Sequence, residues 1–160
     1  MQTQSILDQI RQRLSGIAGS YNRLVLVVGP SGSGKTESLR ALSDVQNVPI
    51  VNIGLEISRQ LLDLTERQQV LHLPRIVAQE VVDHPCDLTI LDNTEVLFNP
   101  ILKQDPLRLL QGLSRDRIIV TSWAGDIDGG LLTFAVPGHP EFRQYSSTDL
   151  LVVSLKAGQV

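Results

Sequence analysis

Gly29-Pro30-Ser31-Gly32-Ser33-Gly34-Lys35-Thr36 follows the apolar run RLVLVV at 23–28 directly and fits G-x-x-x-x-G-K-[ST] at every fixed position. Glycine permits backbone angles that a Cβ would forbid, so successive N–H groups can turn toward one anion. A helical pattern over 37–42 comes next, and the N-terminus of a helix attracts negative charge. The stretch therefore predicts a phosphate-binding loop between a buried strand and a helix.

The residue types of this loop suit a nucleoside triphosphate, and we expect ATP and Mg²⁺ as its ligands. Lys35 offers a cation to the β- and γ-phosphates, where it also assists the transfer chemistry, and Thr36 offers a hydroxyl to Mg²⁺. The predicted nucleotide-binding residues are Gly29, Pro30, Ser31, Gly32, Ser33, Gly34, Lys35, Thr36 and Glu37.

Short apolar runs alternate with segments of helical periodicity along the chain, which implies a parallel sheet with right-handed crossovers. The predicted strands are 23–28, 48–53, 88–91, 117–122 and 150–155. The predicted helices are 4–17, one after the loop, 56–64, 74–84 beginning at Pro74, and 106–114 capped by Asp105. We expect one domain over 1–160 with a three-layer α/β P-loop NTPase fold, a mostly parallel five-stranded sheet and no helical lid domain.

Two further local patterns accompany these elements. Thr65 with Gln68 fits a capping box at the start of another helical turn. The Gly- and Pro-rich stretch 124–147 is long for an α/β connection, and we expect at most a short element at 131–136 within it.

Composition bounds the class of protein. An apolar content of 42% suits a packed core, and a net charge of -3 gives no general attraction to nucleic acid, although 11 of the 14 basic residues are arginine. No run approaches the roughly 18 apolar residues of a membrane span, and the N-terminus lacks signal-peptide features. The single cysteine, Cys86, excludes an internal disulfide. We expect a cytoplasmic protein with no membrane contact.

A carboxylate ends the predicted third strand, where LTIL at 88–91 is followed by Asp92. Ligands of open α/β sheets bind outside the carboxyl ends of the strands, and the phosphate loop also begins at such an end. We therefore expect Thr36 and Asp92 to hold Mg²⁺ together.

The residue that activates the attacking water is less clearly marked. Common ATPases of this class carry Glu directly after the strand-ending Asp, but here Asn93 follows and cannot accept a proton. Glu95 serves as general base if the turn brings it inward, or else it lies in the first turn of a short helix. Thr121 or Ser122, ending the fourth strand, either orients the water or caps the strand, and Trp123 is expected in the core.

Arginines supply a further candidate. Arg143 precedes the fifth predicted strand, where ring-forming ATPases often place an arginine that stabilises transition-state charge across a subunit boundary. Arg115 and Arg117 are weaker candidates, and a surface salt bridge is the alternative for all three. Asp126 and Asp128 do not complete a calcium-loop pattern, so we expect a turn there.

The phosphate loop, the strand ending in Asp92 and the polar end of the fourth strand resemble the core of AAA+ and RecA-like ATPases. Over nearly the whole chain the sequence also resembles the BrxF family, the small P-loop proteins of type 3 bacteriophage exclusion (BREX) systems. The segments behind this are RLVLVVGPSGSGKT with its preceding helix, LEISRQLLDLTERQQ, LTILDNTEVLF, IIVTSWAG and PGHPEFRQY. The resemblance implies a bacterial antiviral defence role with other defence-system proteins as partners. By the family pattern, Lys35 and Thr36 contact phosphate and magnesium, and Asp92 contacts the metal.

Three functions remain open on the sequence. The first is an ATPase whose hydrolysis changes contacts with a partner. The second, favoured by Asn93, is a nucleotide-gated binding or assembly module with little hydrolysis. The third is a small-molecule kinase, for which Asn52 and Glu56 are poor acceptor-binding residues and the single Arg in 124–147 makes a poor lid. Self-association and contact with DNA are left open.

Overall fold

The computed structural model describes residues 2–30, 32–83, 87–135 and 142–155. Its centre is a parallel sheet of β1 (Leu24–Gly29), β2 (Ile50–Asn52), β3 (Leu88–Asp92), β4 (Ile118–Asp128) and β7 (Leu151–Ser154), in the order β2-β3-β4-β1-β7. Each neighbouring pair on this path runs parallel, so the carboxyl ends of all five strands meet at one edge. The predicted parallel α/β sheet is confirmed.

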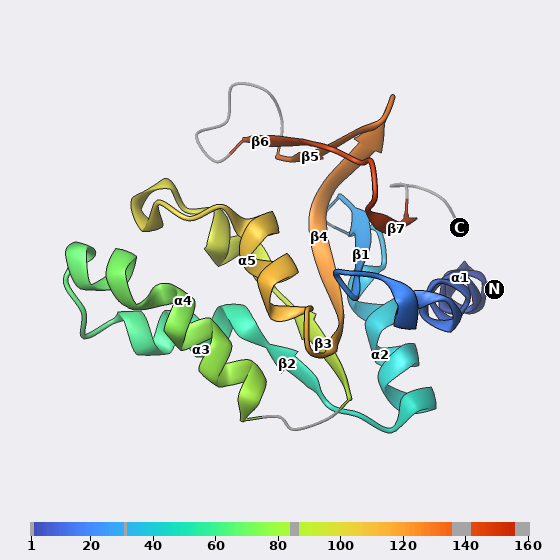
Figure 1. Ribbon diagram of the computed structural model, residues 1–160, viewed down its shortest axis with the longest axis horizontal. Coiled ribbons are helices and arrows are strands. Elements are labelled where there is room, and N and C mark those ends of the chain that lie inside the picture. Colours follow the sequence, from blue (N-terminus) through green and yellow to red (C-terminus); the bar gives the residue numbers. More distant parts are fainter. Residues whose placement is uncertain (1, 31, 84–86, 136–141, 156–160) are drawn as a thin grey trace.

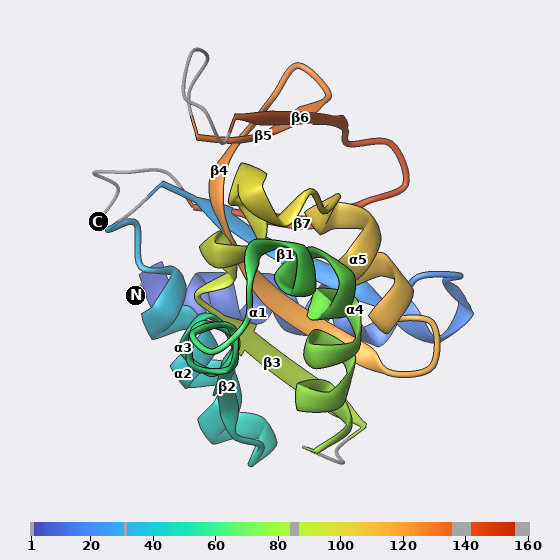
Figure 2. The same ribbon diagram turned by 90° about the vertical axis from the view of Figure 1, so that its left-hand side faces the viewer.

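Helices cover both faces of the sheet and give three layers (Figures 1 and 2). On one face lie α1 (Gln2–Ser15) and α2 (Lys35–Gln46), and on the other lie α3 (Ile53–Leu61), α4 (Glu66–Val82) and α5 (Pro106–Leu113). Short 3-10 helices occur at η1 (Ile17–Gly19), η2 (Thr94–Phe98) and η3 (Pro100–Leu102).

Alternation along the strands divides the core between these faces, because successive strand side chains point to opposite sides. Val25, Val27, Ile90 and Val120 pack with α1 and α2. Leu26, Val28, Leu91 and Ile119 pack with α3, α4 and α5. The continuous apolar runs predicted from the sequence therefore serve two cores at once, as expected for a sheet covered on both faces.

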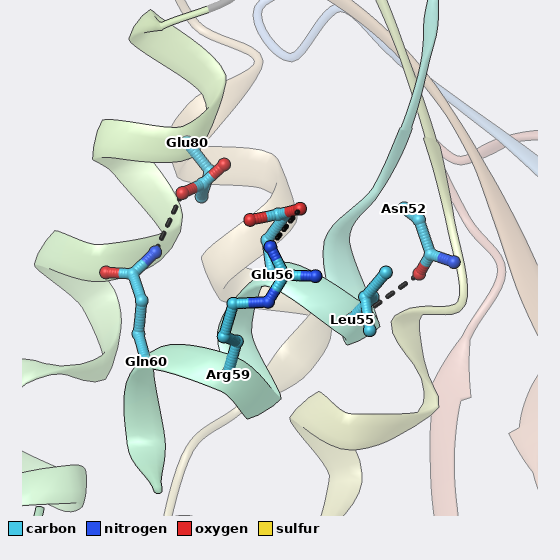
Figure 3. A network of polar contacts seen from close by, with 6 residues as sticks. All are labelled: Asn52, Leu55, Glu56, Arg59, Gln60 and Glu80. Carbon is cyan, nitrogen blue, oxygen red and sulfur yellow. Dashed lines mark hydrogen bonds and ion pairs between the residues drawn. The ribbon is translucent and has the colours of Figure 1, made fainter. Parts of the chain in front are cut away.

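Polar contacts decide where β2 ends and hold α3 against α4 (Figure 3). The Asn52 side chain accepts a hydrogen bond from the Leu55 backbone N–H at 3.0 Å, which caps α3. The strand predicted over 48–53 is consequently shorter, and Ile53 begins the helix instead. Gln60 then donates to Glu80 on α4 at 2.7 Å (Figure 3).

The prediction that a helix begins at Pro74 is wrong, because α4 runs without a break from Glu66 to Val82 with Pro74 inside it. The capping box of Thr65 and Gln68 is confirmed and marks the true start. Proline has no N–H for the carbonyl four residues earlier, which is that of Val70. The Gln104 side chain donates to this carbonyl at 3.2 Å, so tertiary structure supplies the bond that the helix lacks.

The connection over 124–147 holds more structure than predicted. β4 continues to Asp128, and β5 (Leu131–Phe134) and β6 (Arg143–Ser146) add to it as antiparallel strands, so the sheet has seven strands rather than five. These three strands project beyond the parallel core (Figure 1). A Cβ on Gly125 would lie 2.8 Å from the Thr133 carbonyl carbon, so glycine is what lets β5 approach this closely. Residues 136–141 lie outside the described residues.

An aromatic cluster anchors this antiparallel part of the sheet. Phe98 of η2 stacks on Phe134 of β5 with ring centroids 3.6 Å apart. Trp123 packs edge-on against Phe98 and Tyr145, and its indole N–H donates to the Thr133 carbonyl at 3.0 Å. Trp123 is fully buried, as the sequence predicted.

Within the described ranges, no helix combines the length and the apolar character that crossing a membrane requires.

Candidate phosphate-binding site

The phosphate loop leaves the carboxyl end of β1 at Gly29 and enters α2 at Lys35. Gly32 and Gly34 have φ angles of +80° and +99°, which side chains with a Cβ rarely adopt. A Cβ on Gly29 would lie 2.8 Å from the Leu155 carbonyl oxygen, so this position also has no room for a larger residue. The glycines of the motif are therefore required by the loop's shape, while Ser31 lies outside the described residues.

Lys35 is buried, and its ammonium group turns back along the loop. It donates to the carbonyl oxygens of Gly29 at 2.7 Å and Pro30 at 2.8 Å. Burial lowers the pKa of Lys35, and the carboxylates of Glu95 and Asp92 oppose that shift. One cation therefore lies within the field of two carboxylates, beside the free N–H groups at the start of α2.

Thr36 and Asp92, predicted to share a metal ion, are hydrogen-bonded to each other. The Thr36 hydroxyl donates to Asp92 Oδ2 at 2.9 Å, across 56 residues of sequence. Asp92 Oδ1 accepts from the Asn93 backbone N–H at 2.9 Å, which fixes the carboxylate. No cluster of three or more His, Cys, Asp or Glu side chains suited to a metal occurs in the described part of the chain. A hydroxyl and one carboxylate are hard oxygen donors that fit Mg²⁺ when phosphates and water complete its shell.

Asn93 turns the chain sharply at the end of β3. Its backbone is left-handed, with φ 60° and ψ 50°, and its exposed side chain makes no capping hydrogen bond to η2. Glu95 follows in the first turn of η2 and is half-buried. Glu95 therefore starts a short helix, which is the second of the two predicted alternatives, and its carboxylate raises the pKa of Lys35 against the effect of burial.

The two hydroxyl candidates lie within β4 rather than at its end, because the strand continues to Asp128, and they point to opposite faces of the sheet. Thr121 is fully buried on the face of Ile119 and Trp123, away from α2. Ser122 lies on the face of Val120, which α2 covers, and its buried Oγ finds no hydrogen-bond partner among the described residues. Its backbone carbonyl accepts from the Thr94 hydroxyl at 2.9 Å, which ties η2 to β4.

The strand order and the glycine-shaped loop joining β1 to the start of α2, with Lys35 buried there, decide the architecture. The chain has a P-loop NTPase fold.

Comparisons with known proteins gave matches among solved structures. No family model and no curated protein matches the chain. The structure of PCH-2 from C. elegans matches 98% of this chain at 14% identity, with a TM-score of 0.48. The AMPPCP-bound DnaA from Aquifex aeolicus matches 71% of it at 16% identity, with a TM-score of 0.38. The P-loop chain described here spans 42% of the first of these chains and 35% of the second.

The remaining predicted residues lie at the margin of the P-loop or away from it. Glu37 is exposed in the first turn of α2. A Cβ added to Gly34 would lie 3.9 Å from Oε2 of Glu37. Arg143 lies on β6 opposite Phe134 and donates to the Phe142 carbonyl at 3.3 Å. No hydrogen bond or ion pair within the described ranges joins Arg143 to Lys35 or Asp92.

Sequence reasoning missed two residues that shape the P-loop site. Leu155, after β7, donates its N–H to Val28 at 2.7 Å, and its side chain lies 3.7 Å from where a Gly34 Cβ would be. Gly54 of α3 packs against the Asn93 turn, where a Cβ would lie 3.0 Å from Asn93 Cβ. Neither residue belongs to a motif, so only the packing of distant segments identifies them.

Proposed function

We propose that this chain binds ATP and Mg²⁺ at the phosphate loop and hydrolyses the nucleotide. The observation that carries the proposal is the hydrogen bond between Thr36 and Asp92, formed by the residue that follows the buried Lys35 in α2. These three groups are the cation and the oxygen donors that triphosphate chemistry requires. They come from the start of α2 and the end of β3, which are 56 residues apart in the sequence, and this makes a chance arrangement of polar residues a poor explanation.

The proposed roles follow from the position of each group. The loop N–H groups and Lys35 hold the β- and γ-phosphates, and Thr36 and Asp92 hold Mg²⁺. When bound, the metal neutralises charge on the phosphate oxygens. Lys35 gives up its carbonyl partners Gly29 and Pro30 for phosphate oxygens, which are the stronger acceptors because they are charged. Glu37, Ser31 and Ser33 complete the loop's contact region.

Glu95 is the proposed general base that activates the attacking water, since it is half-buried and follows the strand-ending Asp92 at the carboxyl edge of the sheet. Asn93 orients the water through its amide. Ser122 is better suited than Thr121 to add a hydrogen bond, because its free hydroxyl lies on the face of α2. Arg143 takes part in catalysis only if a second copy of the chain brings it to the phosphates.

The alternative function is a nucleotide-gated binding module with little hydrolysis. It is favoured by Asn93, which stands where a proton-accepting Glu would be expected. Single-turnover hydrolysis of ATP by wild type and Glu95→Gln separates the two functions. Loss of turnover with retained binding in the variant supports the enzyme, whereas equal rates in both proteins favour the module.

Binding of ATP is tested by Lys35→Ala, with Lys103→Ala as the matched control on the opposite layer of the fold. A charge-assisted hydrogen bond contributes about 1.5–3 kcal/mol, so ATP affinity should fall about ten- to hundred-fold in Lys35→Ala. Lys103→Ala should bind as wild type does. Calorimetric titration measures both, and equal affinities in the two variants would reject the loop as the site.

The proposed binding of Mg²⁺ by Asp92 is tested by Asp92→Asn, which keeps the shape of the side chain and one accepting oxygen but removes the negative charge. The Mg²⁺ concentration needed for half-maximal ATP binding should rise at least about tenfold, because a hard cation loses an anionic ligand. If wild-type binding does not depend on metal, the role assigned to Thr36 and Asp92 fails.

The cellular role that we propose is bacteriophage defence in the cytoplasm, with other defence-system proteins as partners. It rests on the sequence resemblance to the BrxF family. The test is to challenge a host that carries the defence system with phage. Self-association and contact with DNA are separate properties that this challenge does not measure. Protection should be lost with Lys35→Ala, and full protection in that variant would contradict the role.

A further inference from the structure

We propose that a groove between α4 and η3 docks an acidic amphipathic helix of a partner protein. The groove, called here the α4–η3 groove, has a volume of about 570 Å³. It is lined by Glu66, Arg67, Val70, Leu71, Ile101 and Lys103. It lies away from the phosphate loop, on the opposite layer of the fold from α2.

Apolar side chains remain open to solvent in this groove. Leu71 is 72% exposed and Ile101 is 47% exposed, although both belong to ordered helical turns. The polar residues in the described lining are all charged, namely Glu66, Arg67 and Lys103. A groove lined by apolar and charged side chains fits an amphipathic helix, whose apolar anchors are spaced at i, i+3, i+4 and i+7.

The two walls of the groove are tied to each other by one side chain. The Gln104 side chain donates to the Val70 carbonyl of α4 at 3.2 Å and to the Leu102 carbonyl of η3 at 2.9 Å. The first of these bonds exists because Pro74 leaves the Val70 carbonyl without an intrahelical donor. A preformed surface loses little conformational freedom on binding, which favours recognition.

Charge selects the partner. Arg67 and Lys103 are exposed, and neither takes part in the ion pairs found among residues 2–30, 32–83, 87–135 and 142–155. Among the described lining residues, Glu66 is the only acidic one against two basic ones, so the groove is locally positive on a chain of net charge -3. Complementary charge mainly raises the association rate and excludes wrong partners. The occupant is therefore acidic as well as apolar.

The groove is also connected to Glu95, and this step rests on the proposed function. Its η3 wall follows η2 after a single residue, and η2 carries Glu95 and Phe98. Phe98 packs against Phe134 and Trp123. A shift of η3 therefore moves Glu95 only if η2 moves relative to these two rings. An occupied groove changes the position of Glu95 and hence the rate of ATP turnover.

The test uses a fluorescein-labelled helical peptide of about 20 residues, with Leu at the i, i+3, i+4 and i+7 positions and Glu elsewhere. Fluorescence anisotropy with the full chain should show binding that weakens as salt rises from about 50 to about 500 mM. The same peptide with Lys in place of Glu should bind at least about tenfold more weakly. ATP turnover should change when the Glu peptide saturates the protein.

Variants and controls assign the binding to this groove. Leu71→Asp, and the double change Arg67→Glu with Lys103→Glu, should each weaken binding of the Glu peptide at least about tenfold. Val45→Asp and Arg11→Glu alter an exposed apolar and an exposed basic residue on the other layer, and should have no effect. Thermal melts check that each variant is folded.

Several outcomes would overturn the docking proposal. They are no binding of the Glu peptide below about 1 mM, a preference for the Lys peptide, or unchanged binding by Leu71→Asp. Light scattering that shows a wild-type dimer, converted to monomer by Leu71→Asp, would assign the groove to a second copy instead. Unchanged turnover at saturating peptide would refute only the link to Glu95. A chain that never hydrolyses ATP would refute the proposed function, while the anisotropy result would still decide the groove.

Discussion

Replacing Gly54 by alanine should disturb the Asn93 turn beside the P-loop without touching the phosphate loop itself. Gly54 lies in the first turn of α3, where an added Cβ would be 3.0 Å from Asn93 Cβ and closer still to the Asn93 carbonyl oxygen. Neither the start of α3 nor the turn at Asn93 can shift easily. The Asn52 side chain caps α3, and Asn93 is held in a left-handed backbone conformation. Helix and turn must therefore move apart.

The size of the effect can be worked out from two opposing contributions. Overpacking costs about 1–3 kcal/mol, whereas alanine gains up to about 1 kcal/mol over glycine in a helix. The expected loss of unfolding free energy is about 1–2 kcal/mol, which for a domain of this size lowers Tm by about 2–8 °C. Gly112→Ala is the matched control, because its Cβ would meet nothing within 4 Å in α5, and it should stabilise the protein slightly.

Urea unfolding followed by circular dichroism measures both variants, with an unchanged m-value expected in each. Single-turnover assays on Gly54→Ala should show slower hydrolysis with unchanged ATP affinity, because Asn93 and Glu95 shift while α2 does not. The reasoning is refuted if Gly54→Ala is as stable as Gly112→Ala, or if it loses ATP binding while turnover per bound nucleotide stays normal.

Three more predictions follow from contacts in the structure. Glu95→Gln should reduce single-turnover hydrolysis about 10²–10⁴-fold, the contribution of a general base, while leaving ATP affinity within about twofold; a rate equal to wild type would contradict this. Gln104→Ala should lower the unfolding free energy by about 1–2 kcal/mol in urea titrations, but by less in a Pro74→Ala background, where the Val70 carbonyl regains its helical donor; equal losses in both backgrounds would count against the Val70 contact. Burial and the Asp105 carboxylate raise the pKa of Tyr145 from 10.0 to about 12. The folded state thus keeps a proton that the unfolded chain loses, so stability should fall as pH rises through this interval. The loss of unfolding free energy over this pH interval should be smaller in Tyr145→Phe. An ultraviolet titration of the folded protein in which no tyrosine ionises near pH 12 would refute the raised pKa.

Local chemistry explains what could be predicted. The glycines and Lys35 form a loop because their backbone freedom and charge are properties of those residues alone, and Asp105-Pro106 and Thr65 cap helices through contacts within one turn. The proximity of Thr36 and Asp92 also followed from the sequence, since Thr36 comes after β1, Asp92 ends β3, and the carboxyl ends of these strands meet at one edge. That inference needed only the sheet to be parallel.

Long-range packing explains what could not be predicted. Pro74 stays inside α4 because Gln104, 30 residues later, serves the carbonyl that the proline leaves free. The strands β5 and β6 form because Phe134 and Tyr145 find Phe98 and Trp123, and nothing in the Gly- and Pro-rich segment itself marks those partners. Likewise, the choice between Thr121 and Ser122 depends on which face α2 covers.

The sequence by itself determined a phosphate loop, a parallel α/β sheet and the residues that meet at its carboxyl edge. Each of these depends on backbone geometry or periodicity within a few residues. Only the tertiary structure decided that Ser122 rather than Thr121 faces α2, that Gly54 supports the Asn93 turn, and that Leu71 and Ile101 share an open groove. Those arrangements join side chains far apart in the chain, and no local preference encodes which distant surface a residue will meet.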